Sequence, residues 1–163
     1  MKVIGLDPGL DGALAFLEKE PDTGKLSLMI LRMPAVPAKA KGRDLNVAEL
    51  AQDFNLMYYG AEHAFLEKVG VMPGQGISSA YKFGYVCGVP RGLLAVYGIP
   101  VTYVTPAKWK GDLGLGAAKD HARFRAAELF PDYAHEFKRV KDDGPAEAAL
   151  IAWWGLKSLG VVK

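Results

Sequence analysis

Acidic residues are the side chains of this 163-residue chain whose types and spacing are best suited to chemistry. Asp7 and Glu67 each end a short apolar run, and Glu147 follows either Asp142 or Asp143 at the start of the last helical segment. Such hard oxygen ligands, without a His or Cys partner, suit Mg²⁺ or Mn²⁺ rather than zinc. Two such ions about 4 Å apart can activate a water molecule and stabilise the leaving oxygen of a phosphodiester.

Each acid also has a purely structural explanation. An acid at a strand end is often a turn residue, and an acid in the first turn of a helix complements the helix dipole. Four carboxylates gathered without cations would repel one another, raise each other's pKa values and destabilise the fold. Because ligands gather beyond strand ends in α/β sheets, we predict that Asp7 and Glu67 share one cleft.

Basic residues are concentrated in the second half of the chain. Lys108 and Lys110 follow the fifth predicted strand, and Lys119 and Arg123 belong to the next predicted helix. With Trp109 they form a candidate surface for a nucleic-acid backbone. A run of charges is also commonly just a solvated face, and the net charge of +2 identifies no partner by itself.

Short apolar segments and turn signals predict the elements that position these side chains. The predicted strands are residues 3–7, 13–17, 25–33, 63–67 and 99–104. The predicted helices are residues 46–60, 78–97, 117–131 and 145–159, the last with Pro145 at its first position. Residues 34–43, with two prolines and three cations, are predicted to form a basic loop.

Acids at two strand ends and one helix start, on a sheet with three leading antiparallel strands, describe the ribonuclease-H-like architecture. We therefore predict an α/β fold of this type. Its five-stranded mixed sheet has three antiparallel strands followed by two parallel strands and is flanked by helices. Because half of the 163 residues are apolar, residues 1–163 suit a single nuclease domain.

Composition excludes several other classes of protein. A single cysteine, Cys87, rules out an intramolecular disulfide and a thiolate zinc site, and suits a reducing compartment. Asp7 and Asp11 interrupt any apolar signal-peptide core. No apolar run approaches the roughly 20 residues that span a bilayer. We expect a protein of the cytoplasm without a membrane partner.

Four segments together resemble the RuvC-type Holliday junction resolvases. They are Ile4–Gly9 (IGLDPG), Phe65–Lys68 (FLEK), Val104–Lys110 (VTPAKWK) and Asp143–Ala152 (DGPAEAALIA). The resemblance spans almost the whole chain. It implies a homodimer that binds a four-way DNA junction and nicks two opposed strands, using Mg²⁺ (or Mn²⁺ in its place) as the cofactor.

The resemblance also implies roles for individual residues. Asp7, Glu67, Asp143 and Glu147 match the four catalytic carboxylates that hold the metal. Lys110 and Lys119 occupy the places of the phosphate-contacting lysines of the family. The resemblance favours Asp143 over Asp142, which is kept as an alternative ligand. If the last helix begins near Asp143, then Asp143 and Glu147 share a face, about 40° apart, and Asp142 points toward solvent or the preceding Lys141.

The chain departs from the bacterial pattern in two places. Asp143 and Glu147 are four positions apart, whereas bacterial members usually space the last two acids three apart; the spacing here is closer to phage and organellar relatives. A phage-encoded protein would act in the host cytoplasm. The aromatic wedge of the family would fall near Gly70, so Met72 is the candidate apolar wedge and DNA contact.

Alternative functions remain open from sequence. A RuvC-like nuclease could cut branched or flap DNA generally. A phosphotransferase of the actin-like superfold also begins with an Asp near a Gly-rich turn, but needs a second, related domain. A catalytically idle junction-binding module would be expected to lack at least one acid. For a dimer, the face of helix 78–97 that carries Gly84, Gly88 and Gly92 is the candidate interface.

Overall fold

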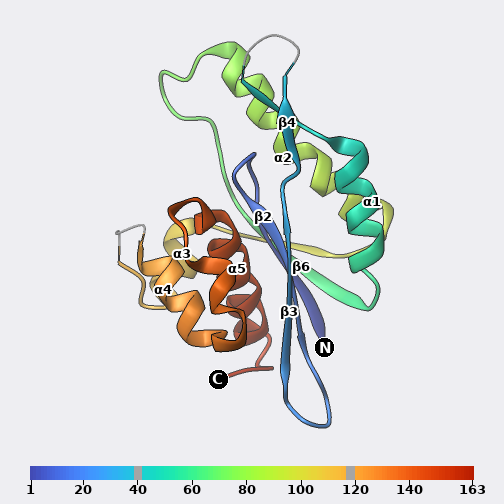
Figure 1. The fold of residues 1–163 in the computed structure, drawn as a ribbon, viewed down its shortest axis with the longest axis vertical. Helices are drawn as coiled ribbons and strands as arrows, with labels where there is room; N and C mark the ends of the chain where they lie inside the picture. The colour runs from blue at the N-terminus through green and yellow to red at the C-terminus, as the bar shows by residue number, and fades with distance from the viewer. Residues whose placement is uncertain (39–41, 117–119) are drawn as a thin grey trace.

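A five-stranded mixed sheet lies at the centre of the computed structural model, which describes residues 1–38, 42–116 and 120–163 (Figure 1). Its strands are β1 (Lys2–Asp7), β2 (Ala13–Lys19), β3 (Leu26–Arg32), β6 (Ala61–Glu67) and β7 (Val101–Val104). They lie in the order β3-β2-β1-β6-β7. The first three pair antiparallel, whereas β6 runs parallel to β1 and β7 parallel to β6. The predicted three-plus-two arrangement is confirmed.

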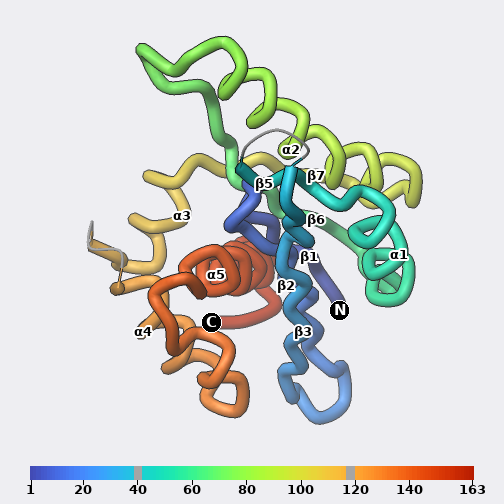
Figure 2. Tube along the Cα trace, turned by 45° about the horizontal axis from the view of Figure 1, so that its top comes forward, coloured from blue at the N-terminus to red at the C-terminus, as the bar shows by residue number. Residues whose placement is uncertain are grey.

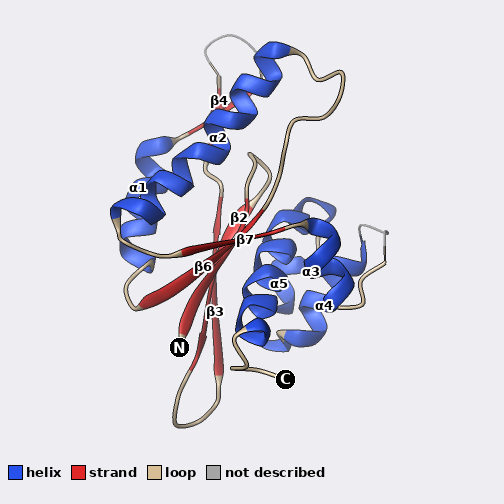
Figure 3. Ribbon diagram, turned by 180° about the vertical axis from the view of Figure 1, so that it is seen from behind, coloured by secondary structure: helices blue, strands red, loops and turns tan. Residues whose placement is uncertain are grey.

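Helices cover both faces of this sheet (Figures 2 and 3). On one face lie α1 (Val47–Met57) and α2 (Ile77–Val96). On the other lie α3 (Pro106–Asp112), α4 (Asp120–Leu129) and α5 (Asp143–Ser158). Two short 3₁₀ segments, η1 (Pro131–Phe137) and η2 (Val140–Asp142), connect α4 to α5. Within the described part of the chain, no helix has the length and apolarity needed to cross a membrane.

The central strand β1 is apolar because both of its faces are covered. Successive side chains of a strand point to opposite faces. Val3 accordingly packs in the core beneath α5, whereas Ile4 and Leu6 pack in the core beneath α1 and α2. Gly5 lies on the α5 side, where a Cβ atom would meet the backbone oxygen of Ala148 at 2.1 Å. The absence of a side chain at Gly5 therefore lets α5 approach the sheet closely.

Local signals account for the start of α1. The side chain of Asn46 accepts a hydrogen bond from the backbone N–H of Glu49 at 3.3 Å, and its Nδ2 donates to the Glu49 carboxylate at 2.8 Å. This satisfies a helix N–H that has no partner within the helix. Leu50 and Phe54 then face the core, as the apolar spacing predicts.

Three segments differ from the prediction. Helix α5 begins at Asp143 rather than at Pro145, because the first backbone N–H groups of a helix need no internal partner and Pro is tolerated there. Helix α3 forms directly after β7, where no helix was predicted. The ends of the predicted basic loop pair as strands β4 (Ala35–Pro37) and β5 (Arg43–Leu45).

Candidate metal centre

The alternation of side chains along β1 and β6 places the first two acids on the same face of the sheet. Asp7 lies two residues after Gly5 on β1, so it points to the same face of the sheet as Gly5 does. Glu67 likewise lies two residues after Phe65 on β6, and Phe65 packs in the core beneath α5. The register of the parallel pair aligns Leu6 with Leu66, so the two acids follow at the same level. Both carboxylates therefore face α5 at the carboxyl ends of neighbouring parallel strands.

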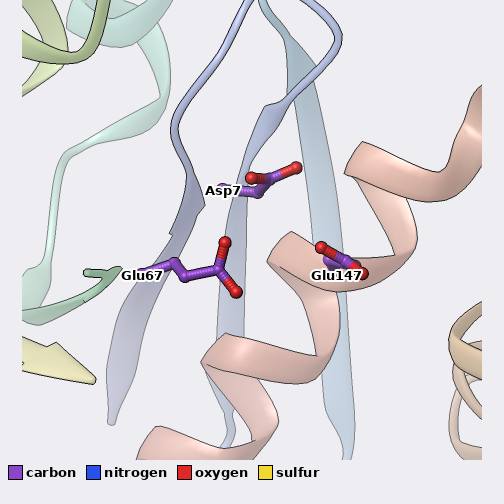
Figure 4. A group of neighbouring side chains, drawn as sticks. All are labelled: Asp7, Glu67 and Glu147. Carbon is purple, nitrogen blue, oxygen red and sulfur yellow. The ribbon is translucent and has the colours of Figure 1, made fainter. Parts of the chain in front are cut away.

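Helix α5 brings the third acid to this edge. Its small residues allow close packing: a Cβ atom on Gly144 would meet the backbone oxygen of Asp11 at 2.1 Å. This contact seats the first turn of α5 against the β1–β2 turn. Glu147, one turn further along the helix, then lies beside the acids of the two strand ends (Figure 4).

Asp7, Glu67 and Glu147 form the three-carboxylate group. Each offers an oxygen atom, and these atoms lie within 4.8 Å of one another. Glu67 is buried, with 7% of its surface exposed. Asp7 and Glu147 line a cleft of about 610 Å³, which Lys110 and Asp143 also line. An all-oxygen set of this spacing suits a hard divalent cation, so the acidic residues present fit such an ion.

The electrostatics of the group favour a bound cation. Burial, together with the negative charges of Glu147 and Glu67, raises the pKa of Asp7 well above its usual value. Burial also raises the pKa of Glu67, and the hydrogen bond from Trp109 opposes that rise. Like charges held in a poorly solvated site disfavour ionisation, and a divalent cation would relieve this cost.

Helix α3 supplies two partners to the group. Lys110 Nζ lies 2.7 Å from Glu147 Oε1, and its positive charge acts to lower the pKa values of Asp7 and Glu67. The neighbouring Trp109 is fully buried, and its Nε1–H donates to Glu67 Oε1 at 2.9 Å. The prediction of Trp109 as part of a DNA-facing surface is therefore wrong. The sequence signal that was missed is Thr105-Pro106, a cap and a first helical residue that together start α3, the helix that carries Trp109.

Known proteins resemble this chain in sequence and in structure. No protein-family model matches the sequence. A curated relative, the chloroplastic Holliday junction resolvase MOC1 of Chlamydomonas reinhardtii, is 36% identical over 98 residues, which cover 59% of this chain and 11% of that protein. The chain thus spans about a tenth of the length of the curated relative that it matches.

Solved structures extend the likeness over the full chain. Thermus thermophilus RuvC in complex with a Holliday junction substrate superposes with a TM-score of 0.65 at 17% identity, covering 100% of this chain and 99% of that one. The chain has the RuvC fold. A second structure of Thermus thermophilus RuvC gives a TM-score of 0.63 at 20% identity, with the same coverage. The yeast mitochondrial Holliday junction resolvase Ydc2 gives 0.53 at 16% identity, covering 98% of this chain and 81% of that one.

The resemblance to RuvC-type resolvases that the sequence predicts is confirmed by these comparisons, as is the ribonuclease-H-like architecture. Within this RuvC fold, the four predicted ligands are not equivalent. Asp143 lines the same cleft as Asp7 and Glu147 but lies outside the three-carboxylate group of the described residues. Its Oδ1 is 2.8 Å from Nε of Arg123. The Arg123 side chain is only 11% exposed and also pairs with Asp120.

Asp142 has a structural environment quite different from that of Asp143. It is fully buried, and its carboxylate accepts hydrogen bonds from Nη2 and the backbone N–H of Arg139, each at 2.8 Å. Arg32 contributes a further ion pair at 3.4 Å. Although burial acts to raise it, these bonds from Arg139 hold the pKa of Asp142 below its usual value. The prediction that Asp142 points toward solvent or Lys141 is wrong, because the chain turns through η2 before entering α5.

The other predicted DNA contacts have different settings. Lys108 is exposed and pairs with Asp112 at 2.7 Å. Met72 is 72% exposed in the loop between β6 and α2, which protrudes from the body of the molecule (Figure 1). Lys119 lies outside the described residues. The DNA contacts of Lys108, Lys119, Arg123 and Met72 stay predictions.

Proposed function

We propose that this chain is a metal-dependent endonuclease that resolves four-way DNA junctions by nicking two opposed strands. The observation that carries the proposal is the three-carboxylate group at the end of β1, within a RuvC fold. The matched relatives are named as Holliday junction resolvases, and one matched structure contains a junction substrate. We further propose that residues 1–163 act as one nuclease domain.

The proposed cofactor is Mg²⁺, for which Mn²⁺ would substitute. Asp7, Glu67 and Glu147 would hold it, and Asp143 is the proposed fourth ligand because it lines the same cleft. When bound, the metal supplies activation of the attacking water and stabilisation of the leaving oxygen. Lys110 neutralises Glu147 in the metal-free protein. Once a cation takes over that neutralisation, the Lys110 ammonium group becomes available to a phosphate of the DNA.

A homodimer is the proposed assembly, because a four-way junction offers two symmetry-related strands that a two-fold dimer matches with one site per subunit. Helix α2 supports this proposal. Gly84, Gly88 and Gly92 have open space around them, and Tyr81 and Val96 on the same helix are 78% and 79% exposed. Glycines beside exposed apolar side chains make a surface suited to close helix packing.

A nuclease acting on branched or flap DNA generally is the alternative within the same chemistry, and the junction resolvases among the relatives do not favour it. Action in the cytoplasm, of a host cell if a phage encodes the chain, stays a prediction; the curated relative is named as chloroplastic.

The decisive experiment compares a synthetic four-way junction with a matched duplex and a matched flap, each with and without Mg²⁺. We expect paired nicks in opposed strands of the junction, abolished by EDTA. Asp7→Asn should abolish cleavage while junction affinity persists or rises, because a negative charge is removed and the basic residues remain. Equal cutting of the linear duplex would refute junction selectivity.

A further inference from the structure

The hydrogen bond between Trp109 and Glu67 joins the middle of helix α3 to the last residue of strand β6, which lies 42 residues earlier in the sequence. We propose that Trp109 is a positioning residue for the metal centre: its indole N–H holds the Glu67 carboxylate in the orientation in which Glu67 binds the cation with Asp7 and Glu147. This inference rests on the proposed metal-dependent function.

The indole is anchored firmly enough to orient another side chain. Trp109 is fully buried in the core beneath α5, where Val104 and Ala146 belong to the same cluster. The start of α3 is fixed by the Thr105 side chain, which accepts from the Lys108 backbone N–H, and by Pro106 at the first helical turn. A side chain held by packing on a capped helix has one rotamer, so its single N–H points in one direction.

Glu67 needs such a partner. A glutamate side chain has several rotatable bonds, and ordering it costs conformational entropy. The bond to Oε1 is 2.9 Å long and buried, so it selects one orientation of the carboxylate and leaves Oε2 for the cation. Removing a residue that hydrogen-bonds a metal ligand typically lowers the affinity for the metal about 10–100-fold.

The competing explanation is that Glu67 merely satisfies a buried indole N–H, which needs an acceptor in any protein. The chain contains a matched control. Trp154 Nε1 donates to Asp112 Oδ2 at 2.7 Å, the same pair of chemical groups outside the three-carboxylate group. Removing the N–H there breaks an indole–carboxylate bond that is exposed rather than buried and does not touch a proposed ligand.

The test measures Mn²⁺ binding to the full chain, without DNA, by electron paramagnetic resonance of the free ion. Trp109→Phe keeps an apolar ring but removes the donor, and we expect about tenfold weaker binding with a cooperative melting transition retained. Trp154→Phe should bind Mn²⁺ as the wild type does. A folded Trp109→Phe with wild-type affinity, or equal losses in both variants, would overturn the role of Trp109.

A second measurement on the wild-type protein keeps the inference testable if Trp109→Phe fails to fold. In protein labelled with ¹⁵N at its three tryptophans, saturating Mg²⁺ should shift the indole N–H resonance of Trp109 and leave that of Trp154 in place. The Trp153→Phe and Trp154→Phe spectra assign those two resonances and leave the third to Trp109. An unmoved Trp109 resonance in protein that binds Mn²⁺ refutes the positioning role alone, whereas wild-type protein that binds neither ion refutes the proposed function as well.

Discussion

Asp7 is the residue at which the proposed function and the stability of the protein are in conflict. Burial and the charges of Glu147 and Glu67 raise its pKa in the folded state. The folded protein therefore binds this proton more tightly than the unfolded chain does. Stability must then fall as pH rises from the unfolded pKa, about 3.9, toward the folded one, so Asp7 leaves the metal-free fold less stable at neutral pH than near pH 4.

From this sign we predict that Asp7→Asn raises the melting temperature of the metal-free protein at pH 7 by several degrees. The gain should shrink as pH falls and disappear below the unfolded pKa of about 3.9, where Asp7 becomes protonated in both states. Thermal unfolding in EDTA across this pH range measures it. Added Mg²⁺ should stabilise the wild type and not the variant; a variant less stable than the wild type in EDTA at pH 7 would contradict the argument.

Ionised Asp142 should stabilise the folded protein, in contrast to ionised Asp7. Its pKa is lowered, chiefly by Arg139 against the effect of burial, so its contribution is complete above the unfolded pKa and lost as pH falls through the folded one. Asp142→Asn should cost about 2 kcal/mol of unfolding free energy at pH 7, as charged hydrogen bonds do. Urea unfolding should show this difference shrinking below about pH 4.

Asp143 should behave as a functional residue instead. Because it lines the cleft and its partner Arg123 is a single side chain, we expect Asp143→Asn to fold and to bind junction DNA while losing Mg²⁺-dependent cleavage. Cleavage assays on Asp142→Asn, run where that variant is folded, provide the comparison. An inactive Asp142→Asn beside an active Asp143→Asn would reverse the assignment.

Among the elements, the contact between β1 and α5 decides whether the three carboxylates meet. A Cβ atom at Gly5 would lie 2.1 Å from the Ala148 oxygen and 2.4 Å from the Ala152 nitrogen, which are backbone atoms that cannot rotate away. Enlarging this residue must therefore move the helix that carries Glu147.

We predict that Gly5→Ala costs about 1–3 kcal/mol of stability, in the range of overpacked cores, and weakens Mn²⁺ binding by the folded protein. Gly111→Ala is the control, because among the described residues no atom beyond its chain neighbours and its own helix backbone lies within 4 Å of the corresponding Cβ position. Chemical denaturation and metal titration measure the two effects. Wild-type metal affinity in a folded Gly5→Ala protein would show that the helix position is not what assembles the group.

For the whole molecule, the proposed homodimer would place one proposed cleavage site in each of two copies of the chain. The exposed glycine face of α2 is the proposed contact between two copies. Gly88→Arg should yield monomers in sedimentation experiments, and these should make single, uncoordinated nicks in a junction. Gly88→Arg places a long charged side chain where close packing is proposed. A wild-type protein that sediments as a monomer at micromolar concentration would count against the interface.

Local patterns in the sequence were enough to predict five sheet strands, three antiparallel followed by two parallel, with an acid at the end of two of them, and the helix that bears Glu147. Strand alternation, turn residues and capping each depend on a few neighbouring residues, so they can be recognised in the sequence alone. The start of α5 was misplaced by two residues, because Pro145 is compatible with several positions in a first turn.

The sequence by itself thus determined which carboxylates could reach the carboxyl edge of the sheet. Only the tertiary structure decided that Glu147 joins Asp7 and Glu67, while Asp143 pairs with Arg123 and Asp142 is buried against Arg139. The same holds for the placement of Trp109 behind Glu67. The physical reason is distance along the chain: which side chains of two separate elements meet depends on how those elements pack, and no local propensity carries that information.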